Sequence, residues 1–175
     1  MEILVTNKLD AVLRFFLVHP AAEIHLRGLS RKLNISFPWV RKLVSVLVNR
    51  GLLISKKERG LVIVTANRED QMYQATKRSY NLLSLHQCGL VNMLIDKYSH
   101  PETIILFGSY AKGEDTEQSD IDIAVMTKRK VELNLYPFEK KLERKIRIQE
   151  LEKKITPDFL TTLANGIVLA GYLEL

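Results

Sequence analysis

Apolar residues in the first third of the chain recur at the spacing of amphipathic helices. Between residues 7 and 19 an apolar residue follows every three or four positions, and the same spacing returns from about 37 to 50. A short extended segment at 23–26 and a short helix with the sequence RGLSRKLN separate these two patterns. Two alternating runs, 52–57 and 61–65, then flank the turn sequence KERG, which predicts a β-hairpin. The first 66 residues therefore predict the order helix, short strand, helix, helix, hairpin.

A helical connector is predicted between residues 67 and 99. This segment contains no proline and one glycine, Gly89, and its leucine, isoleucine and valine residues supply apolar faces. It forms either one long helix or two helices joined near Gly89, and the pattern leaves both open. His86 and Cys88 lie within it, and we expect both to be structural because no further His or Cys gathers nearby.

A third pattern, between residues 103 and 127, brings acidic residues next to buried strands. The apolar run at 104–107 is typical of a strand buried on both faces. Farther on, Asp120 and Asp122 alternate with apolar residues, and residues i and i+2 of a strand share one face about 6–7 Å apart. Two carboxylates so placed repel each other. A bound cation relieves that repulsion, and oxygen ligands favour Mg²⁺ or Mn²⁺.

The first strand of this pattern ends in Gly108-Ser109. A strand that ends in Gly-Ser before a short helix exposes backbone N–H groups that suit a phosphate, and the Ser109 hydroxyl adds a donor. The missing side chain of Gly108 lets a triphosphate approach the backbone. Phosphate-binding backbone, carboxylates and a cation together predict metal-assisted nucleotidyl transfer.

The same stretch resembles the nucleotidyltransferase superfamily that includes DNA polymerase beta, kanamycin nucleotidyltransferase and the minimal nucleotidyltransferases. Its signature is Gly-Ser, ten residues, then Asp-x-Asp, which here is Gly108-Ser109 followed by Asp120-Ile121-Asp122. The closing sequence DFLTTLANGIVLAGYLEL extends the resemblance over about residues 100–175. The resemblance implies that Asp120 and Asp122 hold the metal and that Gly108 and Ser109 bind phosphate. It also implies that Lys112, where relatives often carry a basic residue, adds positive charge at the phosphates, and that the substrate is an NTP, with ATP expected. It also implies a HEPN-type protein partner, as for antitoxins that modify a Tyr or Ser.

A third carboxylate is the least evident part of this resemblance. Active relatives carry another acid on a neighbouring strand, which here is expected at residues 145–151. The position falls near Arg147 or Gln149, and neither is acidic. Glu150 is the acid inside the strand and our candidate. It lies on the wrong face if Ile146 and Ile148 point into the core, unless a bulge reverses the alternation.

Charge is unevenly distributed along the chain. Residues 1–66 hold 11 Lys and Arg against 4 Asp and Glu, whereas the rest of the chain holds 15 against 16. The basic segment resembles a winged helix-turn-helix domain of archaeal and bacterial regulators, through IHLRGLSRKLNIS and the following PWVRKLVSVLVNRGLL. That resemblance implies a helix in the DNA major groove and a hairpin near the backbone. The candidate DNA-binding residues are Arg41, Lys42, Lys56, Lys57 and Arg59. Dimerisation or contact with another protein is the alternative for this segment.

The cysteine content and the lengths of the apolar runs indicate the compartment in which the protein is expected. Cys88 is the single cysteine of 175 residues, so an internal disulfide and a cysteine-based zinc finger are excluded, and a reducing compartment is expected. No apolar run approaches about 18–20 residues, which predicts no membrane span. The start MEILVTNKLD lacks a basic region, so it does not predict a secretory signal. We therefore expect a cytoplasmic protein.

Together these patterns predict a two-domain protein of the α+β or α/β class. We expect a winged helix-turn-helix at 1–66, a helical connector at 67–99 and a nucleotidyltransferase domain with a small mixed sheet at 100–175. The leading hypothesis is a Mg²⁺-dependent enzyme that transfers a nucleoside monophosphate from an NTP to a hydroxyl. The alternative is a DNA-binding regulator whose second domain senses nucleotide without turning it over. The sequence leaves the oligomeric state open, a homodimer included.

Overall fold

The computed structural model describes residues 7–152 and 156–172. The start of the predicted first domain and the last three residues of the predicted closing strand lie outside these ranges. The chain divides into two compact units, Met1–Lys77 and Arg78–Leu175. The predicted fold class is confirmed, because helices and two small sheets alternate along the chain and the second sheet is mixed.

The first unit has the element order predicted from its hydrophobic pattern. It contains α1 (Lys8–Val18), β1 (Ile24–His25), α2 (Leu26–Leu33), α3 (Phe37–Asn49), β2 (Leu53–Glu58) and β3 (Leu61–Ala66). The strands form an antiparallel sheet in the order β1-β3-β2, and β2 and β3 are the predicted hairpin. The Asn7 side chain caps α1 by accepting a hydrogen bond from the Asp10 N–H at 2.9 Å.

Apolar stripes on α1 and α3 build the core of this unit. Val12 and Phe16 on α1 and Val40 and Leu47 on α3 are fully buried. The start of α4 (Gln71–Gln87) joins this core, since the buried Tyr73 hydroxyl donates a hydrogen bond to the Phe16 carbonyl at 2.8 Å. The helical spacing of the sequence therefore becomes the buried face of each helix.

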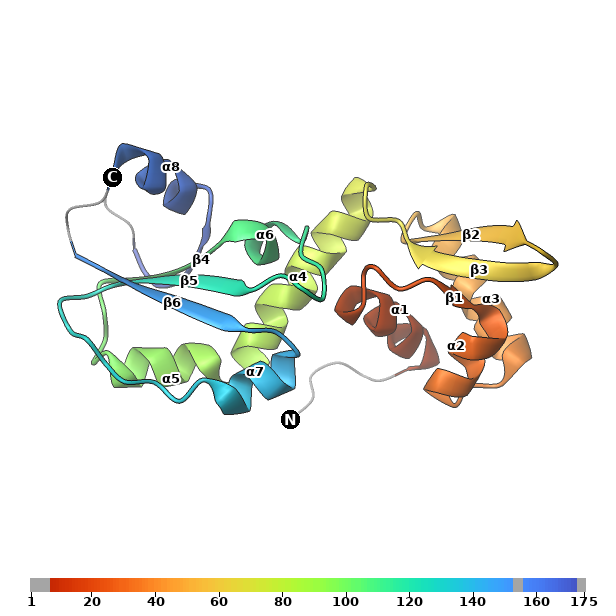
Figure 1. Ribbon diagram of the computed structural model, residues 1–175, viewed down its shortest axis with the longest axis horizontal. Coiled ribbons are helices and arrows are strands. Elements are labelled where there is room, and N and C mark those ends of the chain that lie inside the picture. The colour runs from red at the N-terminus through yellow and green to blue at the C-terminus, as the bar shows by residue number, and fades with distance from the viewer. Residues whose placement is uncertain (1–6, 153–155, 173–175) are drawn as a thin grey trace. The chain divides into compact units, whose positions relative to one another are not determined.

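A four-stranded sheet forms the centre of the second unit (Figure 1). Its strand order is β6-β5-β4-β7, with β5 and β6 parallel and the other pairs antiparallel. The strands are β4 (Thr103–Phe107), β5 (Ile121–Met126), β6 (Ile146–Leu151) and β7 (Ile167–Gly171). The remaining helices are α5 (Leu90–Lys97), α6 (Gly108–Lys112), α7 (Tyr136–Leu142) and α8 (Pro157–Ala164).

The two faces of this sheet are covered by different helices, as Figure 1 shows for α5 and α8. Alternate residues of β4 and β5, among them Ile104 and Ile123, pack with Leu94 of α5. The intervening residues, such as Ile105, pack with Leu163 of α8. All five residues of β4 are buried, which confirms the prediction of a strand enclosed on both faces.

The predicted helical connector consists of two helices. Gly89 separates α4 from α5 and adopts the left-handed conformation with φ of +85°, which glycine adopts without a steric cost. The break decides between the two alternatives that the sequence left open. Cys88, beside it, is half-buried, and its thiol donates to the Leu85 carbonyl at 3.3 Å. Among the helices that the structure describes, none has the length and apolar character needed to cross a membrane.

Candidate active site

The Gly108-Ser109 bend lies where the buried strand β4 gives way to the short helix α6. Gly108 begins α6 with φ of +76°, and Gly113 ends it in the left-handed conformation. Tyr110 and Ala111 are buried and anchor this helix in the core. Ser109 is half-buried, and its carbonyl accepts the Glu114 N–H at 3.0 Å. The bend is therefore held from the core side while part of Ser109 faces solvent.

Asp122 lies directly against Gly108. Antiparallel pairing of β4 and β5 sets Phe107 opposite Asp122, so the residue after Phe107 is next to the carboxylate. A Cβ atom at Gly108 would lie 2.8 Å from Asp122 Oδ2, which is closer than Cβ atoms approach other atoms in proteins. Both the positive φ and this close approach require glycine. The predicted meeting of the bend and the aspartates is thus seen between Gly108 and Asp122.

Asp120 forms an ion pair that the sequence did not predict. Arg147 Nη2 lies 2.7 Å from Asp120 Oδ2. Parallel pairing of β5 and β6 sets Arg147 directly beside Asp122. The Asp120 side chain is 23% exposed and that of Arg147 69%. Arg147 therefore occupies the position on the neighbouring strand where an acid was expected.

Burial and two neighbouring charges change the pKa of Asp122. Burial raises the pKa of Asp122, the Arg147 guanidinium lowers it, and the nearby Asp120 carboxylate raises it. The net result is a pKa above the ordinary value for aspartate. The ion pair of Asp120 with Arg147 and the pairing of Arg147 with Asp122 place these three residues in one electrostatic cluster.

Glu150 does not belong to that cluster. In β6 it pairs with Val125, and both residues lie on the face that α5 covers, opposite the face of Asp122. Its carboxylate Oε1 accepts hydrogen bonds from the Tyr98 hydroxyl at 2.8 Å and from the Val131 N–H at 3.0 Å. The pairing of β5 and β6 continues without a bulge, so the alternation is not reversed. The structure therefore corrects the expectation that Glu150 is a third carboxylate beside Asp120 and Asp122.

A buried polar network supports the loop that leads to Asp120. Asp115 is fully buried and lies 3.5 Å from Arg144 Nη2. Asn81 of α4 donates from Nδ2 to Asp115 Oδ1 at 2.7 Å and to the Tyr110 carbonyl at 2.9 Å. The network ties the loop after α6 to α4 and to Arg144, two residues before β6. Sequence reasoning missed Asp115, because one acid in a polar loop gives no periodic signal.

The other predicted site residues lie in different surroundings. Lys112 is exposed in the last turn of α6, on the helix that Gly108 begins. The cations proposed for DNA are all exposed in the first unit: Arg41 and Lys42 on α3, Lys56 and Lys57 on β2, and Arg59 in the hairpin turn. The cations proposed for DNA thus belong to the first unit, whereas Lys112 and the aspartate pair belong to the second.

The donor set around Asp120 and Asp122 fits magnesium. Within residues 7–152 and 156–172, no group of three or more His, Cys, Asp or Glu side chains is placed to hold a metal ion. Mg²⁺, however, is commonly held by one or two carboxylates together with the phosphates of a nucleotide. Two carboxylates beside a glycine without a side chain match that arrangement.

Comparison with known proteins agrees with this geometry. Residues 91–172 match the family described as "Polymerase beta, Nucleotidyltransferase". The chain contains a nucleotidyltransferase domain. This domain holds α6, both aspartates and all four strands of the second sheet.

A relative from Methanocaldococcus jannaschii, named "Putative protein adenylyltransferase", is 50% identical over 62 residues. The match covers 35% of this chain and 54% of the relative, so the chain spans about half the length of that protein. The family match confirms the predicted resemblance to nucleotidyltransferases for residues 91–172.

Proposed function

We propose that this protein transfers AMP from ATP to a hydroxyl group of a protein, with Mg²⁺ as the cofactor. The observation that carries the proposal is the contact of Gly108 with Asp122, with Asp120 in the same cluster. The nucleotidyltransferase domain supports the class of reaction. The name of the archaeal relative supports a protein as acceptor and an adenylyl group as the part transferred.

Each residue of the cluster has a role in the proposed reaction. Asp120 and Asp122 would hold Mg²⁺, which neutralises charge on the phosphates when bound. The Ser109 hydroxyl donates to a phosphate oxygen, Gly108 leaves room for the phosphate chain, and Lys112 adds positive charge. The acceptor oxygen bonds to the α-phosphorus while the bond to the bridging oxygen of the β-phosphate breaks. Pyrophosphate leaves, and the hydroxyl proton passes to solvent.

Labelling of the full chain and candidate acceptors with ATP that carries a radioactive α-phosphate tests this proposal. We expect label transfer with Mg²⁺ or Mn²⁺, and at least about a hundredfold loss in Asp122→Asn, because metal ligands contribute several kcal/mol of charge stabilisation. Asp96→Asn is the matched control, since Asp96 is an exposed aspartate on α5. A HEPN-type protein is the first acceptor to include. No transfer with either ion, or full transfer by Asp122→Asn, would refute the proposal.

A second candidate function, DNA binding, is favoured by the surface of the first unit. Trp39 on α3 is 49% exposed, and the ammonium groups of Lys42 and Lys8 lie 5.5 Å and 5.6 Å from its ring. An exposed aromatic ring surrounded by cations suits a nucleic acid, whose phosphates attract the cations. We propose that this unit is a winged helix-turn-helix in which α3 approaches DNA.

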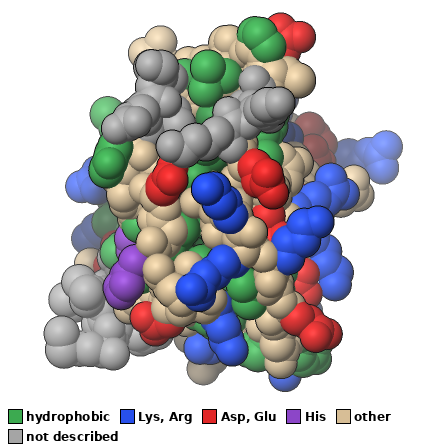
Figure 2. Space-filling model, turned by 90° about the vertical axis from the view of Figure 1, so that its left-hand side faces the viewer, with side chains coloured by type: hydrophobic (Ala, Val, Ile, Leu, Met, Phe, Trp, Pro, Cys, Tyr) green, Lys and Arg blue, Asp and Glu red, His purple; other side chains and the backbone are tan. Residues whose placement is uncertain are grey.

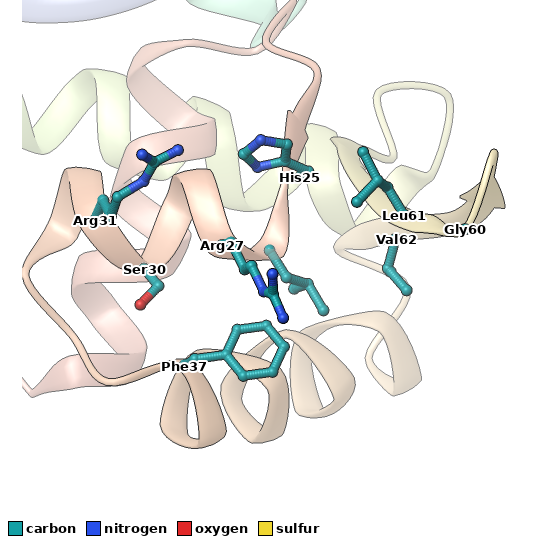
Figure 3. A pocket seen from close by; sticks show the side chains of 9 residues that line it. His25, Arg27, Ser30, Arg31, Phe37, Gly60, Leu61 and Val62 are labelled. Atoms are coloured by element: carbon teal, nitrogen blue, oxygen red, sulfur yellow. The ribbon is translucent and has the colours of Figure 1, made fainter.

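A groove beside α3 adds to this surface (Figure 3). It has a volume of about 950 Å³ and is lined by α2, Phe37 and the hairpin residues around Leu61. Figure 3 shows Arg27 above the Phe37 ring, 5.8 Å from the ring centroid, and Arg31 farther along α2. Figure 2 shows a face of the second unit on which Asp and Glu side chains lie among those of Lys and Arg.

Binding of duplex DNA at increasing salt concentration tests the second candidate. Each phosphate contact adds about 0.9 to the slope of log affinity against log salt concentration. We therefore expect Lys42→Gln to lower this slope by about one, whereas Lys97→Gln, an exposed lysine of the second unit, leaves it unchanged. Binding without salt dependence, or no binding at low salt, would contradict DNA recognition by the first unit.

A further inference from the structure

Arg147 is the feature of the aspartate cluster that the proposed transfer does not use. We propose that Arg147 is a resident counter-ion that holds Asp120 in the free protein and transfers to the triphosphate when nucleotide binds, so that metal and nucleotide bind cooperatively. This inference rests on the proposed function and adds a regulatory step to the same site.

Arg147 forms an ion pair with Asp120, one of the two aspartates. Its Nη2 lies 2.7 Å from Asp120 Oδ2, the distance of a charge-assisted hydrogen bond. A metal ion at the cluster needs the same oxygen. The guanidinium and the metal ion therefore compete for Asp120, and their positive charges repel each other.

Arg147 is also free to move away from the aspartates. β6 is an edge strand of the sheet, and the Arg147 side chain is 69% exposed. The strand itself is fixed by its pairing with β5 and by the buried Ile146. The side chain can thus change partner without a change in the sheet.

The triphosphate is the partner that this side chain would meet. A phosphate bound at Gly108 lies next to Asp122, and Arg147 is the β6 neighbour of Asp122. A guanidinium binds two phosphate oxygens in parallel, as it does two carboxylate oxygens. Release of Asp120 by Arg147 then makes the carboxylate available to the metal, so that each ligand favours the other.

Metal affinity measured without catalysis tests this coupling. Mn²⁺ binding to the full chain is followed by electron paramagnetic resonance, with and without an ATP analogue whose α,β-bridge resists cleavage. An exposed ion pair and the charge repulsion together predict that Arg147→Gln binds Mn²⁺ alone about three- to tenfold more tightly than the wild type. The analogue tightens Mn²⁺ binding strongly in the wild type and by at least about threefold less in Arg147→Gln.

Two further variants separate this role from a structural one. Arg147→Lys keeps the charge and is expected to restore part of the coupling. Arg129→Gln removes an arginine beyond the opposite end of β5, where Nη1 bonds to the Ser99 hydroxyl at 2.6 Å, and is expected to behave as the wild type. Unchanged or weaker Mn²⁺ affinity in Arg147→Gln, or undiminished coupling to the analogue, overturns the inference.

The outcomes for this inference and for the proposed function can be distinguished. If the wild type transfers AMP but Arg147→Gln shows wild-type Mn²⁺ affinity and coupling, the inference alone fails. If the wild type binds neither Mn²⁺ nor the analogue, the proposed function fails and the inference fails with it. If Arg147→Gln does not fold, Arg147→Lys provides the test. Loss of the coupling between Mn²⁺ and the ATP analogue in this variant, which keeps the positive charge, would contradict the role of Arg147 as an electrostatic counter-ion.

Discussion

Replacement of Gly108 by alanine, compared with the same replacement at Gly89, distinguishes the effect of backbone strain from the effect of displacing Asp122. Gly108 has φ of +76°, and an added Cβ would lie 2.8 Å from Asp122 Oδ2. Gly89 has nearly the same backbone conformation, with φ of +85°, and a Cβ there meets no atom within 4 Å. Gly89→Ala is therefore a matched control, because it introduces the same backbone strain without a steric clash with a carboxylate.

The structure gives the size of both effects. A residue other than glycine in the left-handed region costs about 1–2 kcal/mol, so each variant should lose that much stability. In Gly108→Ala the Asp122 oxygen must also retreat from 2.8 Å towards the 3.4 Å of ordinary contact. Because this atom is the end of a side chain, the movement adds little to the loss of stability. It does displace a proposed ligand, and misplacement of about 1 Å in an active site costs about a hundredfold in rate.

We therefore expect similar urea denaturation midpoints for Gly108→Ala and Gly89→Ala, both below the wild type. We expect ATP-dependent label transfer to fall by roughly tenfold to a hundredfold in Gly108→Ala alone. Equal transfer by the two variants would refute the argument that contact between Gly108 and Asp122 organises the site. A loss of stability several kcal/mol larger in Gly108→Ala would show that Asp122 is held rigidly instead.

Three further substitutions or treatments test the packing around the site. Leu94→Ala removes a fully buried side chain of α5 and should cost about 2–5 kcal/mol in urea denaturation; a cost below about 1 kcal/mol would contradict the core described here. Asp115→Ala leaves Arg144 buried without its carboxylate and should destabilise by about 3–5 kcal/mol, whereas a neutral effect would contradict the buried ion pair. Burial raises the pKa of the Cys88 thiol, so its thiolate fraction at pH 8 is below that of an exposed cysteine. Iodoacetamide should therefore react slowly with the native protein, faster as pH rises, and rapidly after unfolding in guanidinium; equal rates before and after unfolding would contradict this placement.

The parts of the fold that sequence reasoning predicted are those governed by local periodicity. The buried strand β4 follows from four successive apolar residues, and the position of Asp122 between the buried Ile121 and Ile123 of β5 follows from an alternation of period two. Helix order in the first unit follows from apolar spacing in the same way. Periodicity alone did not predict that Gly108 lies next to Asp122. That prediction also used the spacing between Gly-Ser and Asp-x-Asp, which recurs in known nucleotidyltransferases.

The parts that could not be predicted depend on register between distant segments. The ion pair of Asp120 with Arg147 exists because β5 and β6 are parallel with Asp122 opposite Arg147. Nothing within either strand encodes that register. Glu150 was the candidate because it is the acid in the expected strand. It alternates in step with Ile146 and Ile148, however, so its side chain lies on their face of the sheet and not on the face of Asp122. The loop acid Asp115 likewise finds its partners Arg144 and Asn81 through tertiary packing alone.

The charges of the cluster explain why this site needs a cation to accept a nucleotide. Two carboxylates and one guanidinium leave a net negative charge beside Gly108, which repels a triphosphate. Burial, together with the Asp120 carboxylate, raises the pKa of Asp122 and so disfavours its ionised form, although Arg147 acts in the opposite direction. A divalent cation reverses the sign of the cluster, satisfies Asp122 and frees Arg147 for the phosphates. These charges therefore favour nucleotide binding when the metal is present, and chelation should weaken binding of the ATP analogue and abolish transfer.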